Sequence, residues 1–101
     1  MTQLPVVCTL TPETMATRRA QLLPGLFRRA QAVEGTGDGY RLRFDSSAET
    51  LRAVAAAIEA ERHCCRFLFF ELVVEPDEAS LVLTLGGPPG TREFIAALCD
   101  L

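Results

Sequence analysis

Residues 40–58 read YRLRFDSSAETLRAVAAAI, and two patterns in this stretch decide the fold. Its first five residues alternate apolar and basic side chains, which is typical of a β-strand with one face on a core. Ser46 followed three residues later by Glu49 forms a capping box, which predicts a helix from about Ser47 to Cys65. A strand that leads directly into a long helix predicts a fold of mixed α and β structure.

The elements on either side of this stretch complete the pattern. They are a strand over 4–10, a helix from 12 to about 30, strands over 32–36 and 39–45, the helix from 47, a hairpin of strands over 67–74 and 80–85, and a helix over 91–98. The order βαββαββα predicts an α+β domain, a mainly antiparallel sheet with helices on one face, and we expect a ferredoxin-like variant. We expect Phe67, Phe69 and Phe70 to lie in the core.

Length and composition limit the kind of protein. The chain has 101 residues, of which 49% are hydrophobic, which fits one domain over 1–101 with its own core. A formal net charge of −3 argues against nucleic acid as a partner. No apolar run reaches the roughly 18 residues of a membrane span, and no signal peptide is recognisable. We therefore expect a cytoplasmic protein that binds neither nucleic acid nor membrane.

The chemistry-bearing residues are cysteines. There are four: Cys8, Cys64, Cys65 and Cys99. No C-x-x-C spacing occurs, which argues against a zinc finger and a thioredoxin-type motif. In a cytoplasmic protein we expect all four as reduced thiols. A disulfide between the adjacent pair would close a small, strained ring.

Topology predicts that three of these thiols converge. If short connections reverse the chain at each element, Cys8 near the end of the first strand lies at the same end of the sheet as Cys64 and Cys65. Cys99 falls on the flank of the last helix, where we expect no partner for it. His63 projects away from the buried stripe, so a solvated position is expected.

Two charged residues lie near the predicted thiols. The expected buried stripe of the long helix consists of Leu51, Val54 and Ile58 and includes Cys65. Glu61 lies on the edge of this stripe, one turn before the thiols, and Cys64 lies on its flank. Arg19 lies within the apolar face of the first helix. An Arg19–Glu61 ion pair would explain both charges, and so would a polar wall of a thiol pocket.

The segment 61–67, ERHCCRF, followed by a hairpin and by GPPG at 87–90, resembles a family of small bacterial proteins. Proteins of this family carry a cysteine near the N-terminus and a Glu-Arg-x-Cys-Cys-Pro-Phe segment, and are associated with heavy-metal resistance and metal-responsive regulators. The resemblance covers the chain from Cys8 to Phe94 and implies functional roles for Cys8, Glu61, Arg62, Cys64 and Cys65. Arg66 replaces the proline of the family pattern.

These features favour a soft-metal or metalloid site. Two or three thiolates without a set of histidine and carboxylate ligands suit Hg(II), As(III) or Cu(I), with Cys8, Cys64 and Cys65 as ligands. Zn(II) also fits if water or Glu61 completes a tetrahedron. The expected role is sequestration, transfer or sensing of the ion.

Two alternatives stay open. The first is a thiol-dependent enzyme acting on a thiol-reactive small molecule, with Cys64 or Cys65 as nucleophile and Glu61 as general acid or base. Arg19, Arg62 or Arg66 would lower the thiol pKa. Such an enzyme could also be metal-assisted. The second is an interaction module, expected as a homodimer joined by a strand edge or by the Phe-rich hairpin.

Overall fold

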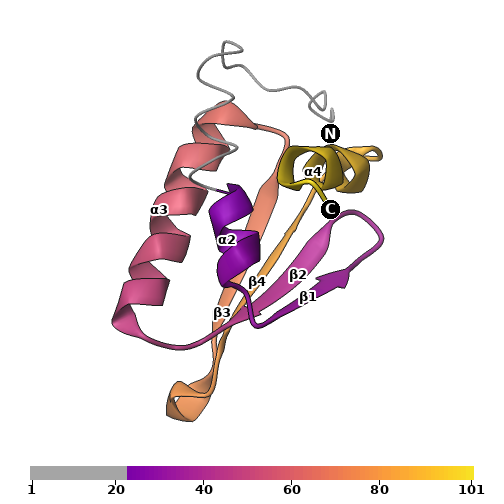
Figure 1. Ribbon diagram of the computed structural model, residues 1–101. Helices are drawn as coiled ribbons and strands as arrows, with labels where there is room; N and C mark the ends of the chain where they lie inside the picture. Colours follow the sequence, from indigo (N-terminus) through magenta and orange to yellow (C-terminus); the bar gives the residue numbers. More distant parts are fainter. Residues whose placement is uncertain (1–22) are drawn as a thin grey trace.

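The computed structural model describes residues 23–101 (Figure 1). The predicted first strand and the start of the first helix lie outside the described residues, and so do Cys8 and Arg19. The elements are α2 (Leu23–Arg29), β1 (Ala32–Gly35), β2 (Tyr40–Phe44), α3 (Ala48–Cys64), β3 (Phe69–Val74), a short 3₁₀ helix η1 (Pro76–Glu78), β4 (Leu81–Gly86) and α4 (Thr91–Cys99).

The four strands form one antiparallel sheet in the order β1-β2-β4-β3. β4, the last strand in the sequence, lies in the interior of the sheet between β2 and β3. The predicted α+β class with a mainly antiparallel sheet is confirmed, and it is consistent with a ferredoxin-like class. The first strand of the predicted order cannot be compared, because it lies outside the described residues.

One face of the sheet carries the core. Leu42, Phe44, Leu83 and Leu85 are completely buried on this face, where they pack with apolar residues of α2, α3 and α4. The alternation that the sequence predicted in β2 is therefore confirmed. The opposite face of β2 and β4 carries polar or partly exposed side chains, and no described helix covers it (Figure 1).

A tight turn joins β1 to β2 at the predicted glycine-rich segment. The N–H of Thr36 donates to the carbonyl of Gly39, and the N–H of Gly39 donates to the hydroxyl of Thr36. A Cβ atom at Gly39 would collide with the carbonyl oxygen of Leu85, so the close approach of β2 and β4 requires glycine there. The turn is structural, as its sequence indicated.

The predicted capping box is wrong by one residue. The N-cap of α3 is Ser47, whose hydroxyl accepts from the N–H of Thr50 at 3.1 Å. Ser46 instead donates its hydroxyl to the carbonyl of Glu78 at 2.6 Å, across to the β3–β4 hairpin. This tertiary hydrogen bond removes Ser46 from the cap, and the adjacent serine replaces it.

The buried stripe of α3 also differs from the prediction. It consists of Thr50, Val54, Ala57, Glu61 and Cys64, whereas Leu51 is 36% exposed. The helix is therefore rotated so that Glu61 and Cys64 lie within the stripe and not on its edge and flank.

The assignment of the three phenylalanines to the core is wrong for one of them. Phe67 is buried, where its ring meets Phe94 edge to face at 5.1 Å between centroids. Phe69 is 50% exposed. The strand begins only at Phe69, so alternation could not be counted from Phe67.

Candidate functional site

The candidate site lies where α3 ends. Cys64 is the last residue of the helix, and Cys65 is its C-cap, with φ −111° and ψ 76°. The N–H of Cys65 still donates to the carbonyl of Glu61, and the carbonyl of Cys65 accepts from Leu68 at 3.0 Å. These two hydrogen bonds hold the turn that leads into β3. Both cysteines are at most 2% exposed, so the turn directs both sulfurs into the protein.

The two sulfur atoms lie 3.6 Å apart and are not bonded to each other. Cys64 is part of a disulfide, whereas Cys65 and Cys99 are thiols. Since a disulfide sulfur carries no hydrogen, Cys65 is the donor in the contact between them. The remaining cysteine of the chain, Cys8, lies outside the described residues.

The expectation of four reduced thiols is therefore wrong at Cys64. That expectation came from the compartment alone. Whether a given cysteine is oxidised also depends on the geometry of the pair, which composition does not contain.

Glu61 is a buried acidic residue of the same helix. Its side chain is only 1% exposed, one helical turn before Cys65. The last carbonyl groups of α3 add the negative end of the helix dipole at the same place.

Cys99 enters this environment from α4. Burial, and after it the charge of Glu61, raise the pKa of its thiol to about 12, and Arg28 opposes the shift. This proximity could not be predicted from the sequence, because Cys99 and Glu61 are brought together only by the packing of α4. A helical wheel shows which residues of one helix share a face, but not which charged residue of another helix lies against that face.

The two basic residues of the last turn face away from the sulfurs. Arg62 and His63 are mainly exposed, and both pair with Glu59, at 3.0 and 2.9 Å respectively. The hydrogen bond from His63, with the charge of Arg62, lowers the pKa of Glu59. The predicted solvated position of His63 is confirmed. Among the described residues, no contact between Arg62 and the two sulfurs supports the role that the resemblance implied for Arg62.

The described residues do not complete a metal site by themselves. Between Leu23 and Leu101 no group of three or more His, Cys, Asp or Glu side chains is arranged to hold a metal ion. The predicted ligands Cys64 and Cys65 are together, and the predicted ligand Cys8 and the predicted partner Arg19 lie outside the described residues.

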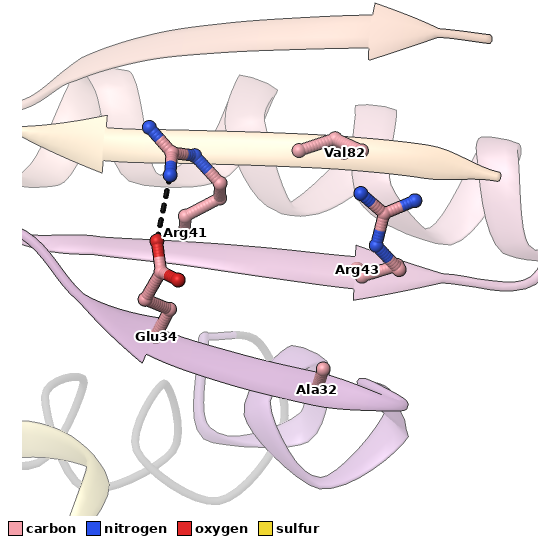
Figure 2. Close-up of a pocket in the computed structure, with 5 residues that line it drawn as sticks. All are labelled: Ala32, Glu34, Arg41, Arg43 and Val82. Atoms are coloured by element: carbon pink, nitrogen blue, oxygen red, sulfur yellow. Dashed lines mark hydrogen bonds and ion pairs between the residues drawn. The ribbon is translucent and has the colours of Figure 1, made fainter.

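A shallow hollow of about 180 Å³ lies elsewhere, on the open face of the sheet. It is lined by Ala32, Glu34, Arg41, Arg43 and Val82, and Figure 2 shows Arg41 turned toward Glu34. Arg41 pairs with Glu34 at 2.6 Å, and Arg43 pairs with Glu75 at 2.9 Å. Because both arginines are already paired with carboxylates, the described residues that line the hollow do not offer a free cation to an anion.

The pKa of Cys99 can be tested directly. We expect its alkylation by iodoacetamide to increase through pH 12 and not near 8.5, the value of an ordinary thiol. Peptide mass spectrometry across a pH series measures this rate. Glu61→Gln should move the profile to lower pH, and Glu59→Gln should leave it unchanged. Since the unfolded chain loses this proton first, stability should fall as the pH rises from about 9 to 12. A profile centred near 8.5 would contradict the burial of this thiol.

No helix within residues 23–101 is long and apolar enough to cross a membrane. No family model, curated protein or solved structure matches the chain, so the residues themselves carry the case for function.

Proposed function

We propose that this protein binds a soft metal or metalloid ion through the reduced sulfurs of Cys64 and Cys65, with Cys8 as the third ligand. The observation that supports this most directly is the placement of the two sulfurs, 3.6 Å apart and both shielded from solvent. The expected ions are Zn(II), As(III), Cu(I) and Hg(II), and the role is sequestration, transfer or sensing.

The distance between the sulfurs fits two ligands of one ion. With a metal–sulfur bond of about 2.3 Å and a tetrahedral angle, two thiolates on zinc lie about 3.8 Å apart. Two thiolates on opposite sides of a linear ion would lie about 4.6 Å apart at the same bond length. The observed 3.6 Å therefore favours an ion with three or four ligands over a linear pair.

The charge around the sulfurs favours binding over nucleophilic catalysis. Reactive thiolates are stabilised by helix N-termini or by nearby cations. Cys64 and Cys65 lie instead at the end of a helix whose buried stripe includes Glu61. A bound cation offsets the negative charge of two thiolates, which no neutral substrate does.

The site needs reduced sulfurs, which is consistent with our proposal of a cytoplasmic location. Glutathione and thioredoxin keep thiols reduced in that compartment. Once the disulfide at Cys64 is opened, that sulfur becomes available as a ligand beside Cys65.

A titration of the reduced protein tests the proposal. We expect one Zn(II) per chain, measured by competition with a chromophoric chelator. Cys64→Ser and Cys65→Ser should each weaken binding by about a hundredfold or more, because a serine hydroxyl does not replace a thiolate. Cys99→Ser is the matched control and should retain the affinity of the wild type. Equal affinity in wild type and in the Cys64, Cys65 double variant would exclude the site.

One observation favours a second function, thiol chemistry at the same place. The thiol of Cys65 contacts a sulfur that is part of a disulfide, which is the arrangement needed for thiol–disulfide exchange. In that case Cys65 loses its proton to Glu61 and its sulfur attacks the sulfur of Cys64. A Cys64–Cys65 bond forms, the existing disulfide bond of Cys64 breaks, and its other sulfur leaves as a thiolate that takes up a proton. A Cys65 pKa well below 8.5 in the reduced protein, measured from alkylation rates, would favour this function over metal binding.

A further inference from the structure

The exposed apolar side chains of the described residues concentrate on β3. Phe69 is 50%, Val73 46% and Val74 59% exposed, and all three belong to this one six-residue strand. β3 pairs with β4 on one side and lies at the edge of the sheet formed by the described residues. It contains no proline and no lysine, two of the devices that protect an edge from pairing with another chain, and Glu71 is its one charged side chain.

The backbone of β3 presents three residues to an incoming strand. The N–H of Glu75 donates to the carbonyl of Ser80, which fixes the phase of the hydrogen bonds between the two strands. By the alternation of an antiparallel pair, Phe69, Glu71 and Val73 bond to β4. The N–H and C=O groups of Phe70, Leu72 and Val74 then point away from β4, along the edge that no other strand between Leu23 and Leu101 covers.

Glu71 gives this edge a charge. Its side chain is exposed on the open face, with Phe69 and Val73 as its neighbours two residues before and after it. It makes no ion pair with any residue from Leu23 to Leu101. In an added antiparallel strand the residue opposite Glu71 would form a non-hydrogen-bonded pair, in which the side chains approach closest.

A second copy of this chain does not complement the edge. Residues 69–75 contain two glutamates and no lysine or arginine, so a pair of β3 strands offers no cation to Glu71. The other edge strand of the described sheet, β1, carries Glu34 on the same face. Either pairing would bring carboxylates opposite or diagonal to each other, which is unfavourable.

We propose that the β3 edge binds an extended segment of a partner protein, which adds a strand to the sheet and places a basic side chain opposite Glu71. The main-chain groups of Phe70, Leu72 and Val74 supply the hydrogen bonds, and the apolar side chains on both faces of β3 supply contact area. The basic residue of the partner determines register and specificity, since only one register places it opposite Glu71.

A pair of peptides tests this proposal on the full chain. The probe is the acetylated peptide SVVTRTV, in which the arginine aligns with Glu71 when the strands are antiparallel, and its match is SVVTETV. We expect the arginine peptide to bind with a dissociation constant on the order of 10 μM and the glutamate peptide about tenfold more weakly. Glu71→Arg should reverse this preference, and Glu34→Arg, on the other edge, should leave it unchanged. Fluorescence anisotropy of labelled peptides measures each affinity.

Hydrogen exchange identifies what occupies the edge. The amides of Phe70, Leu72 and Val74 should exchange quickly in the protein alone and slowly when the arginine peptide is bound. Slow exchange without peptide would show that the chain itself or a second copy already pairs there, and would overturn the proposal. No binding of either peptide, or binding that ignores the charge at Glu71, would overturn it as well. All these outcomes are independent of metal binding at the cysteines.

Discussion

Opening the disulfide at Cys64 is expected to raise the affinity of the protein for Zn(II) at least about a hundredfold. A disulfide sulfur has no proton to lose and is not a thiolate ligand, so the oxidised protein has lost one of the two sulfurs that lie 3.6 Å apart. Zinc requires deprotonated thiols as ligands. When two thiolates bind the same ion, the entropy lost on ordering the site is offset by two metal–sulfur bonds and not by one. Competition titrations before and after treatment with a dithiol reductant, which is then removed without air, measure the difference.

The control is Cys64→Ser, which cannot form this disulfide. Its affinity should be low and should not respond to the reductant, whereas Cys99→Ser should behave as the wild type does. Oxidised wild type that binds zinc as tightly as the reduced protein would show that Cys64 is not a ligand. That result would leave the contact between Cys65 and the disulfide as the functional feature, and would favour exchange chemistry.

The second large effect concerns the sheet on which the site is built. Leu83→Ala is expected to lower the free energy of unfolding by about 3–5 kcal/mol, because the removed side chain leaves a cavity in the core. Leu83 is fully buried on the inner strand β4, where it pairs with Leu42 of β2 and Leu72 of β3. Urea unfolding followed by circular dichroism measures the change.

The adjacent residue supplies a matched control. Val82 lies on the same strand but faces the open side of the sheet, where it is only partly buried. Val82→Ala should therefore cost less than about 1 kcal/mol. Similar losses for the two variants would mean that the open face is covered in solution, contrary to the burial in this structure.

The fold could be predicted from the sequence where local patterns agree with tertiary packing. The alternation in Tyr40–Phe44, the glycine-rich turn before it and the helix after Ser47 each carry a strong local pattern, and the structure confirms them. The sheet order could not be predicted. Nothing in the sequence of β4 says that it lies between β2 and β3, because that order depends on pairing between residues far apart in the chain.

The part of the site that depends on local patterns could also be predicted from the sequence. Adjacent cysteines are visible in any sequence, and their position at a helix end followed from the helix boundary. The buried stripe of α3 is displaced by one residue from the predicted one, because Thr50 is buried and Leu51 is exposed. Glu61 therefore lies within the stripe and not at its edge. The proximity of Cys99 to Glu61 depends on how α4 packs, which no periodicity within α4 contains.

The interior position of β4 has a consequence for the order in which the molecule assembles. Each hairpin, β1–β2 and β3–β4, can form from contacts close in the chain, but the two halves of the sheet meet only through β2 and β4. The β2–β4 pairing joins residues about forty positions apart in the chain. The entropy cost of closing this long loop must therefore be met before the contacts between the strands can stabilise the sheet. A growing polypeptide therefore cannot complete this sheet until synthesis has passed residue 86, and until then β2 lacks its β4 neighbour and is exposed to chaperones and to aggregation.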